Sequence, residues 1–327
     1  MSTVYSKSIA TTIINRHDNF RSNFPTMVKH EKDIESLFRH SIKLGRRLVF
    51  FEGGAVLVIP TNRTYHLKPI TFLGPCKSLL TVMPCVGAPT AVTFDNCINL
   101  RVANIRIKNA QEMHLTFQDC VNVKASNLKV IAPENSPNTD EIHVTRTQNI
   151  QITCSLNRTD DDCISIVSGS KNVRATDIIC GPGHGMSIGS LGKNKAEDEV
   201  SDVVVDRARI SGTTNGGGSG YAKNIKFQNI IMHNVTNPII INQNYCDQLE
   251  SCPEQHSAVQ VTNVVYKNIR GTSASEVAVK LDCSTTFPCN GIVLQNVNPV
   301  REGETKAKAS CQNVRLPSTE RVSPLCQ

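Results

Sequence analysis

The chain has 327 residues, of which 39% are hydrophobic and 19% are charged, and its formal net charge is +7. This balance is enough for a folded core and excludes an intrinsically disordered chain. The positive charge favours an anionic partner. Aromatic residues make up only 5% and Trp is absent, so we expect no nucleic acid partner, and no apolar run approaches the roughly 18 residues of a membrane span.

The N-terminal part of the chain divides into two predicted segments. Residues 1–28 show no clear period, and we expect a poorly defined segment there, followed by one domain over 29–327. The stretch HEKDIESLFRHSIKLG has Ile34, Leu37 and Ile42 at helical spacing and ends at Gly45. It predicts a short amphipathic helix that caps the open end of a repeat-built domain.

One phrase then recurs along the chain: a small polar residue followed by alternating apolar positions. Its seven starts are 22 to 39 residues apart, at Asn99, Asn122, Asn149, Asn172, Asp202, Asn224 and Asn263. Between most of these phrases lies a second short strand-like run, such as MHLTFQDC, EIHVTR and CISIVSG. A β-sandwich also has many short strands, but the regular restart favours stacked coils, and we expect a parallel β-helix. The recurring asparagines fit left-handed turn positions or side-chain ladders.

The rung that opens at Asp202 is an exception between residues 99 and 224, because it has no apolar second run. Rungs of a solenoid contact only their neighbours, so whole rungs are lost more easily than half a rung. We therefore expect a local hole in the core beside this rung.

Thirteen cysteines and sequons at Asn62, Asn157 and Asn234 favour an oxidising, secreted setting. The first residues show no apolar leader, so either a leader is missing from this chain or the protein stays inside the cell. Cys163 and Cys180 are suitably spaced to bridge adjacent rungs. Three later pairs would cross-link loops and the C-terminal end, namely Cys246 with Cys252, Cys283 with Cys289 and Cys311 with Cys326.

Three successive rungs carry polar clusters, NTDEIHV, TDDDCISI and CGPGHGMSI. Asp140, Asp162 and His184 are each 22 residues apart, so we expect them to stack on one outer face. Crowded carboxylates raise one another's pKa, which lets one stay protonated as an acid while others act as bases. This suits inverting hydrolysis of a glycosidic bond. A Ca²⁺ site and a solvated Asp-rich turn remain open alternatives.

Four motifs in order, SPNTD, DDCISI, CGPGHGMSIGSLG and GGSGYAKNIKFQNI, resemble the plant polygalacturonases of glycoside hydrolase family 28. The resemblance runs from about residue 30 to the C-terminus. It implies an all-β fold, a single-stranded right-handed parallel β-helix, and inverting hydrolysis of α-1,4-galacturonan without metal or cofactor. It also implies a secreted, monomeric cell wall protein whose partner is pectin or polygalacturonic acid.

The resemblance also implies roles for individual residues. Asp161 would be the general acid, Asp140 and Asp162 would activate the water, and His184 would support the protonation of the acid. The residues implied for the sugar-binding cleft are Asn138 and Tyr245.

The chain departs from the family pattern in two ways. Glu141 and Asp160 replace glycines, which adds negative charge beside the aspartates. The family also has an Arg-Ile-Lys strand that holds the galacturonate carboxylate, whereas residues 211–220 read SGTTNGGGSG, and the similar run at 106–108 lies several rungs too early. Two alternatives follow: an impaired homologue that at most binds pectate, and a Ca²⁺-dependent lyase on the same architecture.

Overall fold

The computed structural model describes most of the chain from residue 92 onward, together with the backbone of four short strands before it. The fully described ranges are 92–108, 110, 113–132, 140–158, 161–189, 191, 198–211, 221–243, 259–303 and 306–326, apart from the side chains of residues 158 and 221. The predicted capping helix and the predicted domain boundary at residue 29 lie outside the described residues. Both therefore stay predictions.

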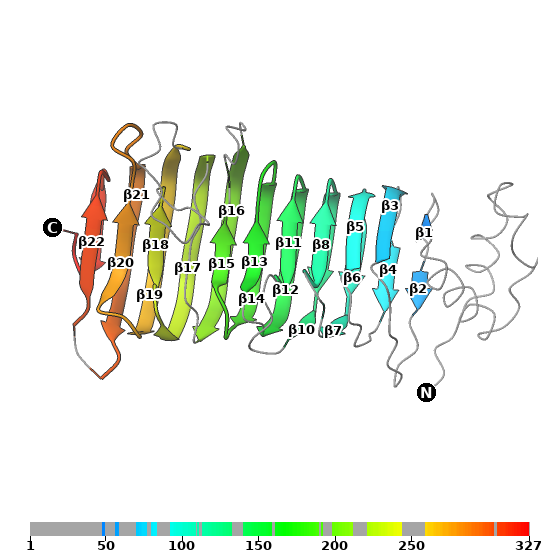
Figure 1. Ribbon diagram of the computed structural model, residues 1–327, viewed down its shortest axis with the longest axis horizontal. Helices are drawn as coiled ribbons and strands as arrows, with labels where there is room; N and C mark the ends of the chain where they lie inside the picture. Colours follow the sequence, from blue (N-terminus) through cyan, green and yellow to red (C-terminus); the bar gives the residue numbers. More distant parts are fainter. Residues whose placement is uncertain are drawn as a thin grey trace, which may run out of the picture.

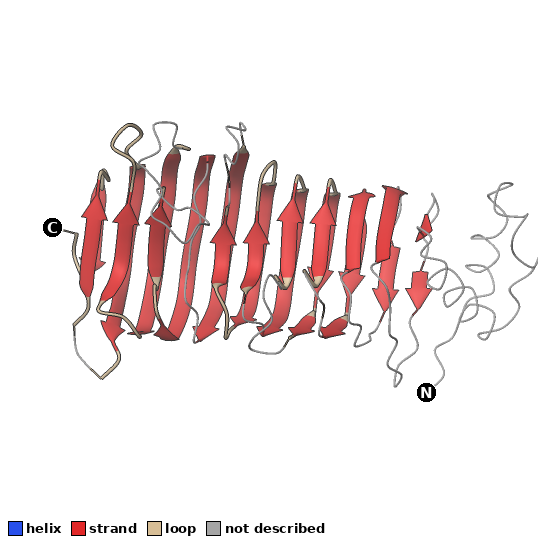
Figure 2. Cartoon of the chain, in the orientation of Figure 1, coloured by secondary structure: helices blue, strands red, loops and turns tan. Residues whose placement is uncertain are grey.

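Every element of the described chain is a strand, and the strands form three sheets (Figures 1 and 2). The seven-stranded sheet contains β1 (Leu48–Val49), β3 (Ile70–Cys76), β5 (Val92–Cys97), β8 (Leu115–Gln118), β11 (Ile142–Thr145), β13 (Asp162–Ile166) and β15 (Gly185–Ile188). The three-stranded sheet contains β18 (Ile239–Asn242), β20 (Val277–Asp282) and β22 (Lys308–Gln312). No helix long and apolar enough to span a membrane occurs among the described residues.

The thirteen-stranded sheet contains the remaining strands. Its main path is β2 (Val56–Val58), β4 (Leu80–Met83), β6 (Leu100–Ala103), β9 (Val121–Ser126), β12 (Gln148–Arg158), β14 (Lys171–Cys180), β16 (Glu199–Ser211), β17 (Tyr221–Val235), β19 (Val261–Ser273), β21 (Asn290–Arg301) and β23 (Ser318–Val322). Two short strands, β7 (Arg106–Lys108) and β10 (Lys129–Ile131), pair beside this path.

Successive strands alternate between sheets and pair in parallel with the strand one coil later, as β12 does with β14 and β13 with β15. The chain therefore winds as a right-handed parallel β-helix, and the predicted fold class is confirmed. Figure 1 shows the rungs stacked along the long axis. Inward positions stack in register and are buried: Phe94 pairs with Phe117, and their rings stack at 5.6 Å between centroids.

The recurring asparagines start the rungs, as their spacing predicts. Asn99, Asn122, Asn149 and Asn172 have φ values of 54° to 59°, a left-handed conformation that asparagine tolerates better than most residues. The side-chain amides of Asn122, Asn149 and Asn172 each donate a hydrogen bond to the amide oxygen of the preceding asparagine in this series, at 2.8 to 3.0 Å. The ladder therefore sets both the turn and the register of the coil.

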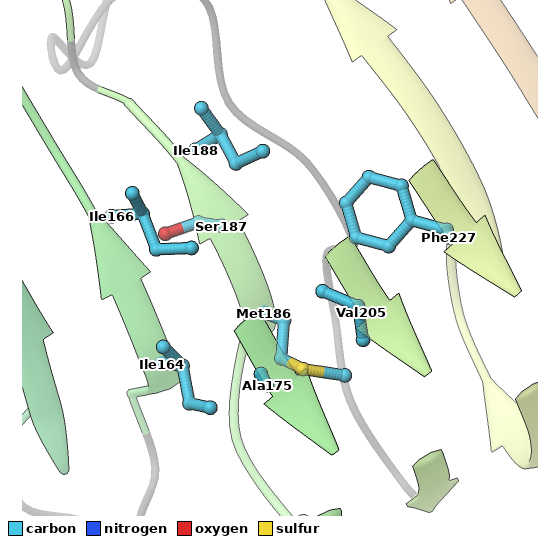
Figure 3. Close-up of a pocket in the computed structure, with 8 residues that line it drawn as sticks. All are labelled: Ile164, Ile166, Ala175, Met186, Ser187, Ile188, Val205 and Phe227. Carbon is cyan, nitrogen blue, oxygen red and sulfur yellow. The ribbon is translucent and has the colours of Figure 1, made fainter. Parts of the chain in front are cut away.

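The described strands show a break between two sheets at the rung of Asp202. The seven-stranded sheet ends at β15 and the three-stranded sheet begins at β18, and no described strand lies between β16 and β17. Residues 212–220 lie outside the described residues. A narrow apolar pocket, too tight for a water molecule, lies at the break, lined by Ile164, Ile166, Ala175, Met186, Ser187, Ile188, Val205 and Phe227 (Figure 3). Residues that could line the rest of this space are not described, so the predicted hole stays a prediction.

Three of the four expected disulfides are formed, namely Cys163–Cys180, Cys283–Cys289 and Cys311–Cys326. The fourth, between Cys246 and Cys252, lies outside the described residues. Cys163 and Cys180 have Cα atoms 5.8 Å apart and join β13 to the end of β14. This bridge fixes the start of β13, where the aspartates are.

Candidate active site

The polar clusters of three successive rungs meet at the N-terminal ends of β11, β13 and β15. The backbone N–H of Glu141 donates to the carbonyl of Asp162 at 2.9 Å, and the N–H of His184 donates to the carbonyl of Asp161 at 2.9 Å. Because these bonds join neighbouring rungs, they bring the segments that carry Asp140, Asp161 and His184 side by side.

The pairing between β13 and β15 places Asp161, rather than Asp162, beside His184. A uniform 22-residue spacing predicts that Asp162 lies opposite His184. A register shift between Asp162 and Ile164 places Asp162 opposite Gly185 instead. His184 Nδ1 lies 3.0 Å from Asp161 Oδ1. That oxygen also accepts a hydrogen bond from the backbone N–H of Asp162 at 2.8 Å. The imidazole of His184 and the backbone N–H of Asp162 therefore converge on one carboxylate oxygen of Asp161.

His184 is the accessible member of the group, since 46% of its side-chain surface is exposed and only 15% of that of Asp161. Gly183 and Gly185 flank it with φ values of 135° and 96°. These values are strained for residues with a side chain. The two glycines therefore allow the sharp backbone turn that leaves the imidazole of His184 at the surface.

Asp162 holds a proton more strongly than an ordinary aspartate. Burial raises its pKa to about 7, and the nearby carboxylates of Asp140 and Asp161 act in the same direction. Ser187, which donates a hydrogen bond to Asp162 Oδ2, and His184 lower the pKa but do not offset the burial. The site therefore keeps one proton up to about neutral pH, which acid catalysis requires.

A second histidine belongs to the site. His143 Nδ1 lies 3.2 Å from Asp140 Oδ2, and the two side chains are only 14% and 13% exposed. His143 is in register with Ser165, which is in register with Ser187, so these side chains form one outward column beside the aspartates. The sequence analysis missed His143 and Ser187. Both residues could have been found from the sequence, because each occupies an outward-facing position in a strand that begins with one of the catalytic motifs.

The added carboxylate of Glu141 does not face a bound polymer, because Glu141 is fully buried. Asn157 is also buried, and its amide donates to the carbonyl of Cys163 at 3.1 Å. The folded protein therefore does not present the amide of Asn157 for glycosylation. The remaining residues expected at the site lie outside the described residues, namely Asn138, Asp160 and Tyr245.

Asp161, Asp162 and His184 each offer a ligand atom within 4.8 Å of the others. Ca²⁺ prefers six to eight oxygen ligands, and this group supplies two carboxylates and one imidazole nitrogen. The donor set therefore fits Ca²⁺ poorly. It fits a group that holds and transfers a proton, since the carboxylate of Asp161 helps to raise the pKa of Asp162.

The cationic run Arg106–Lys108 lies away from these residues along the coil. It forms β7, where Lys108 is in register with Ile131 of β10, and Ile131 is in register with the last residue of β12. Asp161 follows β12, so the run lies two rungs earlier, as the sequence predicts. It does not replace the cationic strand missing between β16 and β17.

Comparison with known proteins extends these observations. The family model described as glycosyl hydrolases family 28 matches residues 74–323. Polygalacturonase QRT2 of Arabidopsis thaliana is 53% identical over 84% of this chain and 77% of its own length. A polygalacturonase of Persea americana is 49% identical over 80% of this chain and 71% of its own length.

Solved structures agree on the fold. The endo-xylogalacturonan hydrolase from Aspergillus tubingensis superposes with a TM-score of 0.64 at 19% identity, over 92% of this chain and 99% of that one. The polygalacturonase from Erwinia carotovora gives 0.60 at 20% identity, over 84% of both chains. At such identities the likeness shows the same β-helix. Together with the matched sequence model and the plant relatives, it shows that this chain belongs to glycosyl hydrolases family 28.

Proposed function

We propose that this protein hydrolyses the α-1,4-galacturonosyl bonds of pectin or pectate with inversion, in cell wall modification. The observation that carries the proposal is the group of Asp161, Asp162 and His184, in which ligand atoms lie within 4.8 Å and burial raises the pKa of Asp162 to about 7. The names of the similar plant proteins support the substrate.

In the proposed reaction Asp161 protonates the glycosidic oxygen as the bond to the anomeric carbon breaks. A water attacks that carbon from the opposite face, and its proton passes to Asp140 or Asp162. Asp140 does not join the group within 4.8 Å, which suits a base that leaves room for a water molecule. Asn138 and Tyr245 would bind the sugar.

The proton for this step comes from within the group. In the unliganded protein it resides on Asp162, because burial raises the pKa of that carboxyl to about 7. We propose that it passes from Asp162 to Asp161 as the leaving oxygen approaches, which frees Asp162 as an acceptor. His184, beside Asp161, supports this transfer.

The proposed setting is extracellular, with the protein acting as a monomer on the cell wall. Three disulfides support an oxidising compartment. Of the sequon residues, Asn234 is exposed. The net charge of +7 favours an acidic polymer.

The first test is the release of reducing ends from polygalacturonic acid near pH 5, beside an Asp161→Asn control, with the product anomer followed by NMR. We expect activity that disappears in the control and persists with a chelator. Loss of activity with the chelator would favour the Ca²⁺-dependent lyase. A folded sample that binds the polymer without cleaving it would favour the impaired homologue.

A further inference from the structure

A column of cations runs along the outer face of the thirteen-stranded sheet. Strand pairing places Arg101, Lys124, Gln151, Arg174, Val204 and Lys226 in register on β6, β9, β12, β14, β16 and β17. We name this set the cationic column. It contains four cations and no carboxylate over six consecutive rungs, a length of about 24 Å at the usual strand spacing.

The cations of the column have no compensating partners among the described residues. Arg101, Lys124 and Arg174 are exposed, and none of them forms a hydrogen bond or ion pair with the described residues. Like charges opposite one another on neighbouring strands are destabilising. Arg101 lies directly opposite Lys124, so this pair costs the fold some stability unless an anion lies along the column.

At other places on the coil, cations pair with carboxylates of neighbouring rungs. Arg146 Nε lies 2.7 Å from Asp119 Oδ1. Glu199 pairs with both Lys171 and Lys223, at 2.9 and 2.8 Å. The column differs from these places because the positions in register with its cations on the adjoining rungs hold no carboxylate.

The column is bordered by groups that suit a carbohydrate. The Asn99, Asn122, Asn149 and Asn172 ladder lies two residues before it on the same strands, and these amides are exposed. Amides hydrogen-bond hydroxyl groups, whereas the column holds no aromatic side chain on which a nucleic acid base could stack. Charge and composition therefore both favour a linear acidic polysaccharide.

The column is separate from the aspartates and His184. On β12 the chain bends at Cys154, whose φ is 52°, between Gln151 of the column and Asp161. The two sets of residues consequently lie on different faces of the coil. An occupant of the column leaves the aspartates accessible.

We propose that the cationic column is a second, non-catalytic binding surface on which a polygalacturonate chain lies along the solenoid axis. Its carboxylates pair with Arg101, Lys124, Arg174 and Lys226, and its hydroxyls meet the asparagine ladder. The surface tethers the protein to de-esterified pectin. The choice of polymer rests on the proposed function, but the binding does not depend on turnover.

The test compares two triple variants of the full chain with equal charge change. The column variant is Arg101→Gln, Lys124→Gln and Arg174→Gln. The control variant removes three exposed cations of the C-terminal rungs, through Arg270→Gln, Lys306→Gln and Arg315→Gln. Affinity for long polygalacturonate is measured in an Asp161→Asn background, and hydrolysis of a short oligogalacturonate is measured without that substitution.

We expect the column variant to bind the polymer about 10-fold more weakly and with a shallower salt dependence, since each exposed cation contributes modestly. The control variant should change by less than 2-fold, and hydrolysis of the oligomer should be unchanged in both. Equal losses in both variants, no loss in either, no binding by the parent chain, or equal column-dependent binding of duplex DNA would each overturn the proposal. If the protein does not hydrolyse the oligomer, the proposed function fails. The comparison of polymer binding by the two variants still tests the cationic column.

Discussion

His143 Nδ1 lies 3.2 Å from Asp140 Oδ2, and both side chains are almost covered. His143 lies in the motif NTDEIHV, but the sequence analysis assigned it no catalytic role. It holds the carboxylate of Asp140 in one orientation, so it acts as a positioning residue for the proposed water-activating group.

We predict that His143→Ala lowers kcat about 10- to 100-fold with little change in KM, because a carboxylate displaced by about 1 Å loses this much rate. Steady-state kinetics on an oligogalacturonate measure both constants. Thr116, in register with His143 on the preceding rung, provides the matched control as Thr116→Val. A raised KM with unchanged kcat would show that His143 binds substrate instead.

The raised pKa of Asp162 predicts a specific pH dependence of stability. Its pKa rises from 3.8 to about 7 on folding, so between these values the native protein binds more protons than the unfolded chain. The stability from the neutral carboxyl is therefore complete below about pH 4 and is lost as the pH rises through about 7. Asp162→Asn should stabilise the protein relative to the parent by roughly 2 to 4 kcal/mol at pH 8 but little at pH 4.

Urea unfolding of both proteins at pH 4, 6 and 8 measures this difference. The gap between the two free energies of unfolding should widen steadily across the series. Parallel curves would mean that Asp162 titrates as an ordinary aspartate, and the proton held by the site would then have to reside on another group.

Ser187 sets the alkaline limit of activity in the proposed mechanism. Its hydrogen bond to Asp162 stabilises the carboxylate and lowers the pKa, so Ser187→Ala should raise that pKa further. We predict that the alkaline limb of kcat/KM, which should fall above about pH 7 in the parent, moves to higher pH in this variant. Ser165→Ala, in the same column, is the control and should leave the limb in place. A shift toward lower pH would contradict the assignment.

The fold was predictable because the turn residues themselves carry the period. Asn99, Asn122 and Asn149 adopt left-handed conformations that few other residues accept, and their amides bond from rung to rung. Local preference and long-range pairing therefore coincide at the same positions, and the spacing of one residue type reveals the coil.

The contacts within the site were less predictable because they depend on register at the level of one residue. A shift between Asp162 and Ile164 moves Asp161 opposite His184, and no spacing of motifs encodes such a shift. Ser187 becomes a partner of Asp162 through the same pairing. The sequence predicts that crowding raises the pKa of one carboxylate, but the larger cause at Asp162 is burial, which depends on packing across several rungs.

The asparagine ladder predicts a separable stability effect at Asn149, whose φ is 58° and whose side chain bonds to the rungs on both sides. Asn149→Gly keeps the left-handed turn but loses both amide contacts, whereas Asn149→Ala loses the contacts and strains the turn. We expect a loss of about 1 to 2 kcal/mol for the glycine variant. The alanine variant should lose about 1 kcal/mol more. Thermal unfolding of both variants measures the contribution of the amide hydrogen bonds and the added strain of the turn separately. Equal losses would mean that the turn carries no conformational strain and that the ladder acts through its hydrogen bonds alone.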